Sequence, residues 1–272
     1  MKRILVPTDF SDAADRARDY AINIAELLNA EIFLLNTYHI PHAGATMAVN
    51  VNNLARESSE KEMQNQLEYL ELNFPEMDVR SKCIAGLFVD TVKRLSETEQ
   101  IDLVVMGTTG TSGVVGNFLG SNASALIGSI KTPIITVPAS TPINFPSKIV
   151  VANDLKDHGN DSVYNPLKQL INKTKATVDF LFITDEDNQY ENKVNRLKAA
   201  DFDEGFDSYY HPFHFKESDN AEDGILEYIE DKDFDMLVVV CHQRSFWQRL
   251  WERSTSKSLA KHAEIPILVL TD

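Results

Sequence analysis

The run IDLVVMG at residues 101–107 occurs a second time, as FDMLVVV, at residues 234–240. A second pair of matching segments follows, KTPIITVP at 131–138 and EIPILVL at 264–270. The offset between Asp102 and Asp235 equals the offset between Pro133 and Pro266. Because self-similarity at a fixed offset is the signature of duplicated structure, the chain is predicted to contain two copies of one fold.

Short apolar runs alternate with longer amphipathic segments along each copy. In the first copy we expect helices near residues 11–28, 53–73, 89–97 and 122–130, with Ser11 capping the first helix and a loop over 39–52. The expected strands are 3–7, 31–37, 79–84, 101–106 and 133–138, then 147–152, 176–183, 207–215, 235–241 and 266–270. This alternation indicates α/β domains with parallel sheets covered on both faces. We predict domains at 1–140 and 146–272, joined by a proline-rich linker.

The composition argues against several classes of partner. The 272-residue chain has a net charge of −15, and both halves are acidic. No nucleic-acid partner is expected, because binding one needs a basic surface. No apolar run reaches the roughly 20 residues that span a membrane, so no membrane partner is expected either. Cys83 and Cys241 are far apart with no CxxC pair, which favours a cytoplasmic protein with buried thiols.

The stretch GTTGTSGVVGNFLGSNAS at 107–124 follows the fourth expected strand. It matches neither the P-loop nor the GxGxxG pattern of dinucleotide-binding folds. Gly107 and Gly110 follow a strand end, where open α/β sheets bind ligands, and Gly120 and Ser121 precede a predicted helix whose free N–H groups would attract an anion. Glycines also let the backbone approach a phosphate closely. The alternative is an ordinary glycine-rich loop that caps a helix.

The glycine spacing and its flanks resemble the ATP-binding members of the universal stress protein family. The resemblance rests on Gx2Gx9G[ST] after LVVMG, on ILVPTDFSDAA at 4–14 and on SNASALIGSIKTPIITVP at 121–138. It extends over the whole chain and implies two tandem open-sheet α/β sandwiches of the adenine nucleotide alpha-hydrolase-like type. Each would have a five-stranded parallel sheet in the order 3-2-1-4-5. It also implies pairing of the last strands, either within a monomer, as an internal pseudo-dimer, or in a homodimer.

The resemblance also implies the positions of a nucleotide site in the first domain. Pro7, Thr8 and Asp9 would lie beside the adenine and ribose, Thr37 would meet the adenine through its backbone, and Met106 and Gly107 would lie near the ribose. Gly110, Gly120, Ser121 and Asn122 would hold the phosphates. The ligand would be ATP, or else ADP or AMP, with or without Mg²⁺ or Mn²⁺. The segment TSGVVGNFL at 111–119 departs from many relatives because it carries no basic residue.

The second copy does not repeat this glycine pattern. Cys241 or His242, Arg244, Arg253 and Ser254 stand where the first copy has its glycines and serine. We therefore predict a degenerate second domain that does not bind ATP in the manner of the family. Its segment SFWQRLWER at 245–253 interleaves aromatic residues with arginines. Such a segment is typical of a protein-binding surface or an anion site, and equally of aromatic side chains packed in a core.

These observations predict a universal stress protein that binds an adenine nucleotide in its first domain and has a regulatory role in the stress response. The alternatives are a scaffold that binds no nucleotide and acts through the second-domain Trp/Arg surface, or a slow ATPase. No residue is predicted to be catalytic, so an enzyme is the weaker interpretation. The pairs His39/His42 and His211/His214 lack the further ligands of a metal site. The acidic run ESSEKEMQ at 57–64 is interpreted as a solvated helix face.

Overall fold

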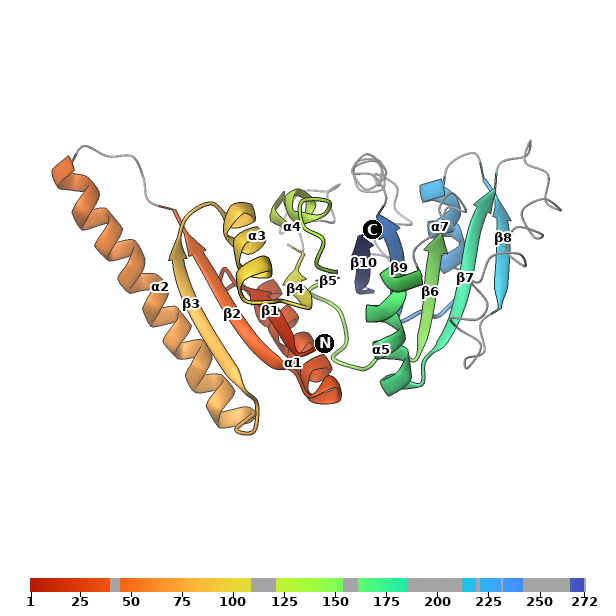
Figure 1. Cartoon of the computed structure of the whole chain (residues 1–272), viewed down its shortest axis with the longest axis horizontal. Helices are drawn as coiled ribbons and strands as arrows, with labels where there is room; N and C mark the ends of the chain where they lie inside the picture. The colour runs from red at the N-terminus through yellow and green to blue at the C-terminus, as the bar shows by residue number, and fades with distance from the viewer. Residues whose placement is uncertain are drawn as a thin grey trace. The chain divides into compact units, whose positions relative to one another are not determined.

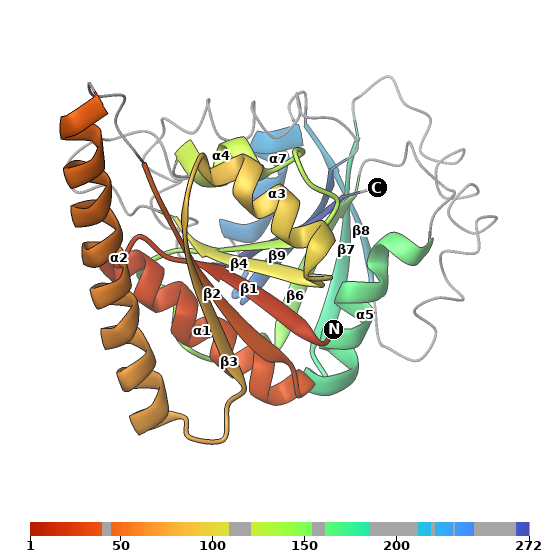
Figure 2. The same cartoon turned by 60° about the vertical axis from the view of Figure 1, so that its left-hand side comes forward.

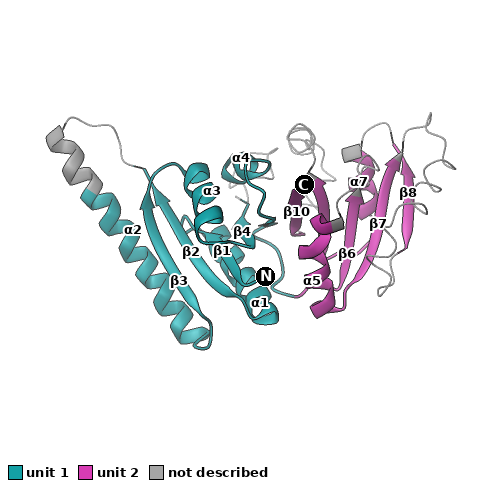
Figure 3. Ribbon diagram, viewed as in Figure 1, with its two compact units in different colours: residues 1–110, 119–144 teal, residues 111–118, 145–272 magenta. Residues whose placement is uncertain are grey.

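A computed structural model describes residues 1–39, 45–108, 121–153, 161–184, 212–218, 221–230, 232–241 and 265–271. These residues form two compact units that divide between residues 144 and 145 (Figure 3). We call them unit 1 and unit 2, and describe each by itself. The predicted pairing of the last strands of the two domains stays a prediction.

Unit 1 is a parallel sheet with the strand order β3-β2-β1-β4-β5. Its strands are β1 (Arg3–Pro7), β2 (Glu31–Tyr38), β3 (Val79–Ala85), β4 (Leu103–Gly107) and β5 (Ile134–Val137). Its helices are α1 (Asp12–Leu28), α2 (Ala45–Asn73), α3 (Phe88–Thr98) and α4 (Ser121–Leu126). Right-handed crossovers place α1 and α2 on one face of the sheet and α3 and α4 on the other (Figures 1 and 2). The core is built from the apolar residues of β1, β2, β4 and β5, which are buried, together with apolar helix residues such as Tyr20 and Val92, whereas β3 at the edge is only partly buried.

Local sequence explains where these helices begin and end. Ser11 is the N-cap of α1, as predicted, and its side chain accepts a hydrogen bond from the Ala14 amide at 3.3 Å. The helix predicted over 122–130 ends earlier, at Leu126, because Gly128 has a left-handed φ of 72° and closes a turn. The loop predicted over 39–52 was too long, since α2 already begins at Ala45. Residues 45–52 contain neither Gly nor Pro, so nothing in the sequence stops the helix there.

Unit 2 has the same topology, with the order β8-β7-β6-β9-β10. Its strands are β6 (Lys148–Asn153), β7 (Thr177–Thr184), β8 (Phe213–Glu217), β9 (Met236–Cys241) and β10 (Ile267–Thr271). The described helices are the 3-10 turn η1 (Asp161–Tyr164), α5 (Asn165–Thr174) and α7 (Ala221–Glu230). The predicted fold class and the strand order 3-2-1-4-5 are thus confirmed in both units. The third strand was predicted at 207–215, and its described part runs from 213 to 217.

The described residues contain neither a membrane-spanning helix nor a cluster of metal-ligating side chains. None of their helices combines the length and apolarity that crossing a membrane requires. No group of three or more metal-ligating side chains comes together among them either. Within these limits, the described parts of the two units offer neither a membrane span nor a metal cluster.

Candidate functional site

The carboxyl ends of β1, β2 and β4 meet at one edge of unit 1 and surround a cavity of about 160 Å³. Eight of the ten residues predicted for the nucleotide site lie in its wall. They are Pro7, Thr8, Asp9, Thr37, Met106, Gly107, Ser121 and Asn122. The other two, Gly110 and Gly120, belong to the segment 109–120, which lies outside the described residues. In an open parallel sheet this edge is the usual place for a ligand, because the strand order reverses between β1 and β4.

The turn that leaves β1 is the most constrained part of this wall. Phe10 has a φ of 64°, a left-handed conformation that residues with a Cβ rarely adopt. Side chains on either side of Phe10 hold the turn. Thr8 Oγ1 accepts a hydrogen bond from the Phe10 amide at 2.9 Å. Asp9 Oδ1 accepts from the Ser11 amide at 3.1 Å and from Ser11 Oγ at 2.5 Å. These bonds engage Oδ1 of the carboxylate and so fix the direction of Asp9.

A buried polar chain lies directly behind this turn. Asn36, on β2, donates from Nδ2 to the Thr8 carbonyl at 2.7 Å, and its Oδ1 accepts from Ser59 Oγ of α2 at 2.6 Å. Thr8, Asn36 and Ser59 are all buried, with 8%, 7% and 5% of their surface exposed. This chain was not predicted from the sequence, and the interpretation of residues 57–64 as a solvated helix face is wrong for Ser59. The available signal was the single amide in the apolar strand EIFLLNTY.

Gly107 has a structural reason for lacking a side chain, besides the close approach to a phosphate that the sequence suggested. A Cβ at this position would lie 2.5 Å from the Ala13 carbonyl oxygen and 2.7 Å from its carbon. These are backbone atoms at the start of α1, which cannot move aside as the tip of a side chain can. Gly107 therefore lets the end of β4 pack against the first turn of α1, and this contact closes one wall of the cavity.

The remaining side chains of the wall add apolar and hydroxyl groups. Leu35 and Phe88 supply apolar surface from β2 and α3, and neither was predicted from the sequence. Ser121 and Asn122 are exposed at the start of α4, which spans only six residues. Because the helix dipole is the sum of aligned peptide units, so short a helix attracts an anion less strongly than the longer one predicted.

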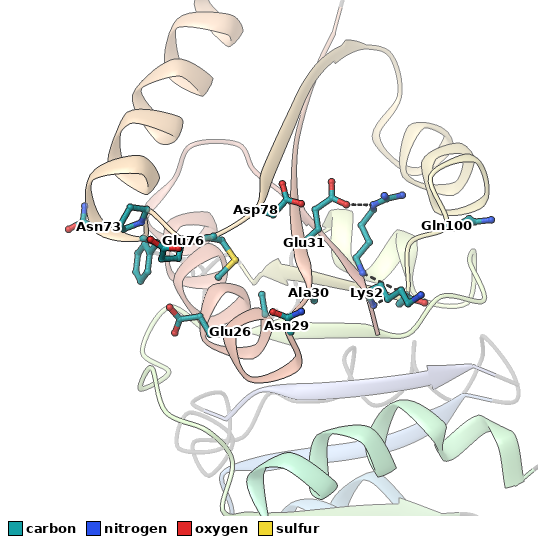
Figure 4. Close-up of a pocket in the computed structure, with 15 residues that line it drawn as sticks. Lys2, Glu26, Asn29, Ala30, Glu31, Asn73, Glu76, Asp78 and Gln100 are labelled. Carbon is teal, nitrogen blue, oxygen red and sulfur yellow. Dashed lines mark hydrogen bonds and ion pairs between the residues drawn. The ribbon is translucent and has the colours of Figure 1, made fainter.

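A larger cavity, of about 940 Å³, lies at the opposite edge of unit 1, where the strands begin (Figure 4). Of its five acidic residues, Glu26, Glu31, Glu76 and Asp78 are spread around it rather than directed at one point, and the fifth is Asp102. Its charged groups also serve the fold, since Arg3 Nε donates to Glu31 Oε2 at 2.8 Å. We therefore assign the candidate site to the smaller cavity, where the constrained turn and the predicted residues meet.

Unit 2 has its own buried polar cluster, but not at the strand ends that correspond to the cavity. Asp179 of β7 is buried, and its Oδ2 accepts from Tyr228 Oη at 3.2 Å and lies 3.2 Å from His214 Nε2. The Lys232 ammonium lies 3.8 Å from the same oxygen. Burial, followed by the Asp179 charge, raises the pKa of Tyr228. The cluster fastens α7 to strands β7 and β8.

Several predicted features lie outside the described residues: His42, His211, Arg244, Arg253, Ser254 and the aromatic segment 245–253. Of the two cysteines predicted to be buried, Cys83 is only half-buried, because it lies on the edge strand β3. Its free thiol donates to the Ser59 carbonyl at 3.5 Å, and partial burial raises its pKa. Cys241 ends β9.

Comparison with known proteins gives concordant results for the two halves. The universal stress protein family model matches residues 1–138 and again residues 147–271. A universal stress protein of Methanocaldococcus jannaschii is 30% identical over 138 residues, which cover 50% of this chain and 81% of that protein. A universal stress protein of Synechocystis is 24% identical over 296 residues, which cover 98% of this chain and 99% of that protein.

A solved structure agrees over the full length. The crystal structure of a universal stress protein from Archaeoglobus fulgidus covers 99% of this chain and 98% of its own, with a TM-score of 0.75 and 17% sequence identity. At that identity the likeness concerns the fold alone. Together with the two family matches, it supports a tandem arrangement of two domains. The chain belongs to the universal stress protein family.

Proposed function

We propose that unit 1 binds an adenine nucleotide in the cavity between the ends of β1, β2 and β4. The observation that carries this proposal is the convergence of eight predicted residues, from four separate stretches of sequence, on one cavity. Asp9 is the one ionisable side chain among the described residues of its wall, and it is held by Ser11. A carboxylate fixed in this way accepts hydrogen bonds from ribose hydroxyls or from the adenine amino group.

The size of the cavity indicates which part of a nucleotide it would hold. Pockets that enclose a whole ligand usually have volumes of about 300–1,000 Å³. At about 160 Å³, the described cavity suits the base and ribose. The phosphates would then lie toward Gly107, Ser121 and the segment 109–120. A Mg²⁺ or Mn²⁺ ion would be held mainly by phosphate oxygens, because the described wall offers it only the Asp9 carboxylate.

The proposed role is regulatory binding rather than catalysis. Asp9 is the only carboxylate in the described wall, and its position suits recognition of the nucleoside. Any hydrolysis of ATP should be slower than about one turnover per minute, well below ordinary catalytic rates. A role in the stress response and a cytoplasmic location stay predictions, as does the lack of a nucleotide site in unit 2.

The test begins with the native protein. Denaturing the purified protein and analysing the supernatant by mass spectrometry should detect a released adenine nucleotide. Calorimetry of nucleotide-free protein with ATP and Mg²⁺, and with AMP, should then give saturable binding. Asp9→Asn should weaken binding about tenfold or more, because the carboxylate–hydroxyl bond is replaced by a weaker one. Asp90→Asn is a matched control, since Asp90 is an exposed carboxylate on α3 outside the cavity. Absence of both released nucleotide and calorimetric binding would refute the proposal.

A further inference from the structure

The turn from Thr8 to Ser11 needs support from outside itself. Its left-handed residue is a phenylalanine, whose Cβ disfavours the observed φ of 64°. Strained residues of this kind persist where the surrounding structure determines them, and they gather at functional sites. Three of the supporting bonds come from within the turn, one through Thr8 and two through Asp9. A further bond comes from Asn36 on the neighbouring strand, which donates to the Thr8 carbonyl at 2.7 Å.

Asn36 is a buried amide at a position where an apolar side chain could fill the same space. A buried amide costs free energy unless both its donor and its acceptor are satisfied, whereas an apolar side chain carries no such requirement. Here both ends are satisfied, the donor by Thr8 and the acceptor by Ser59. The amide therefore links three elements: the end of β1, the interior of β2 and the middle of α2.

Unit 2 supplies the comparison that isolates this role. Val6 pairs with Leu34 in unit 1, and the corresponding Val151 pairs with Phe180 in unit 2. Two residues further along β2 and β7, Asn36 therefore corresponds to Phe182. Phe182 is fully buried and stacks on Phe213 and Phe215. The same position of the same fold thus accepts a large apolar side chain in unit 2.

We infer that Asn36, fixed by Ser59, is a positioning residue of the nucleotide site, which holds the strained turn that presents Asp9 to the ligand. This inference rests on the proposed function for its consequence in binding. Its structural part, the support of the turn, stands apart from any ligand. The long helix α2 thereby takes part in shaping the cavity, although the cavity wall contains no α2 residue among those described.

The test uses the full-length chain and two readouts. Asn36→Leu removes the amide but keeps the number and branching of the side-chain heavy atoms, and Ser59→Ala removes only the hydroxyl that orients it. Ser96→Ala is the control, because Ser96 is a buried serine on α3 outside the cavity wall. Calorimetry with ATP and Mg²⁺ measures affinity, and hydrogen exchange of the ligand-free protein measures protection of the Phe10 and Ser11 amides. Asn36→Leu combined with Asp9→Asn completes a double-mutant cycle.

We expect Asn36→Leu to weaken binding about tenfold and Ser59→Ala less, with Ser96→Ala unchanged. In the Asp9→Asn background the further loss should be under about twofold, because Asn36 acts through Asp9. The Phe10 and Ser11 amides should exchange about tenfold faster in Asn36→Leu, while the Leu5 and Val6 amides keep their protection.

The outcomes separate this inference from the proposed function. If the wild-type protein binds no adenine nucleotide, the proposed function fails, and the exchange of the two turn amides alone decides whether Asn36 positions the turn. If Asn36→Leu lowers the melting temperature but leaves affinity and turn exchange at wild-type values, Asn36 is a core residue only and the inference is overturned. Ser59→Ala gives the same decision if Asn36→Leu does not fold.

Discussion

The two units begin their sheets in the same way. In unit 1, Asp102 Oδ2 accepts hydrogen bonds from the Lys2 amide at 2.6 Å and the Arg3 amide at 3.1 Å. In unit 2, Asp235 Oδ2 accepts from the Ser147 and Lys148 amides at 2.8 and 2.9 Å, and from Ser147 Oγ at 2.5 Å. In both copies the aspartate before the fourth strand thus accepts hydrogen bonds from amides at the start of the first strand. We call this contact the clasp, and both copies of the repeat contain it.

The interiors of the two sheets differ in where they bury polar groups. Unit 1 places Asn36 near the carboxyl end of β2, where unit 2 has Phe182. Unit 2 places Asp179 near the start of β7, where unit 1 has Phe33. One unit therefore uses its buried polar group at the edge that carries the cavity, and the other uses it to fasten α7. Equal topology therefore does not give the two units the same buried polar groups.

Phe182→Asn should have the largest effect of the changes that test this comparison. It places the asparagine of unit 1 at the corresponding position of unit 2. There the Phe182 ring stacks on Phe215 and Phe213, with 5.3 and 6.0 Å between ring centroids. The loss of the buried ring and the cost of an unpartnered amide should lower the free energy of unfolding by about 3–5 kcal/mol. Urea unfolding followed by circular dichroism measures this. Phe182→Leu is the control and should cost clearly less. A mild effect of Phe182→Asn would mean that unit 2 offers the amide partners, and the contrast would be lost.

Gly107→Ala and Gly224→Ala compare two glycines that are tight for different reasons. A Cβ at Gly107 meets the Ala13 backbone, whereas one at Gly224 of α7 meets side-chain atoms, Ser218 Cβ at 2.9 Å and Ile183 Cδ1 at 3.0 Å. Gly107→Ala should lower the free energy of unfolding by about 2–3 kcal/mol through overpacking. Gly224→Ala should cost less, because the gain in helix propensity of about 1 kcal/mol offsets part of the crowding against Ser218 and Ile183. Equal losses for both, measured by thermal unfolding, would show that the Ala13 contact is not special.

These contrasts also show what the sequence could predict. The repeat and the fold class followed from apolar runs and matching segments such as those around Asp102 and Asp235, because strand burial leaves a periodic signal. The strand order was implied by the resemblance to universal stress proteins. Eight of the positions implied by resemblance also meet at one cavity. The bond from Asn36 to Thr8 could not be predicted, since the two residues lie 28 positions apart and only strand register brings them together. The end of α4 depended on the backbone angle of Gly128, which composition does not fix.

Removing either aspartate of the two clasps should lower the free energy of unfolding by a smaller amount, which depends on the number of hydrogen bonds lost. Asp235→Ala leaves two amides and a hydroxyl without their acceptor, and Asp102→Ala leaves two amides. Both sites are exposed, so water replaces part of what is lost. We expect about 1–2 kcal/mol for Asp235→Ala and about 1 kcal/mol for Asp102→Ala, from urea midpoints at constant slope. The reverse order would mean that hydrogen-bond number does not set the strength of the clasp.

The smallest effect expected concerns pH and belongs to unit 2 alone. Burial, and then the positive charge of Lys232, lower the pKa of His214 below its ordinary value of 6.5, while Asp179 opposes the shift. Among the described residues, Tyr228 is a further titratable group beside His214. Its ring centroid lies 5.4 Å from that of the imidazole. The neutral imidazole is therefore the form that the folded unit prefers.

The sign of the effect follows from linkage. As pH falls through about 6.5, His214 takes up a proton in the unfolded chain before it does so in the folded one. The contribution of His214 to the free energy of unfolding is therefore complete above that pH and declines as pH falls toward the folded pKa. His214→Gln should make the dependence of unfolding free energy on pH shallower between about pH 5 and 7. His39→Gln, at an exposed histidine of unit 1, is the matched control. If the His214 variant is instead steeper than the wild type, the Asp179 carboxylate outweighs burial and Lys232, and His214 is held as a cation in an ion pair.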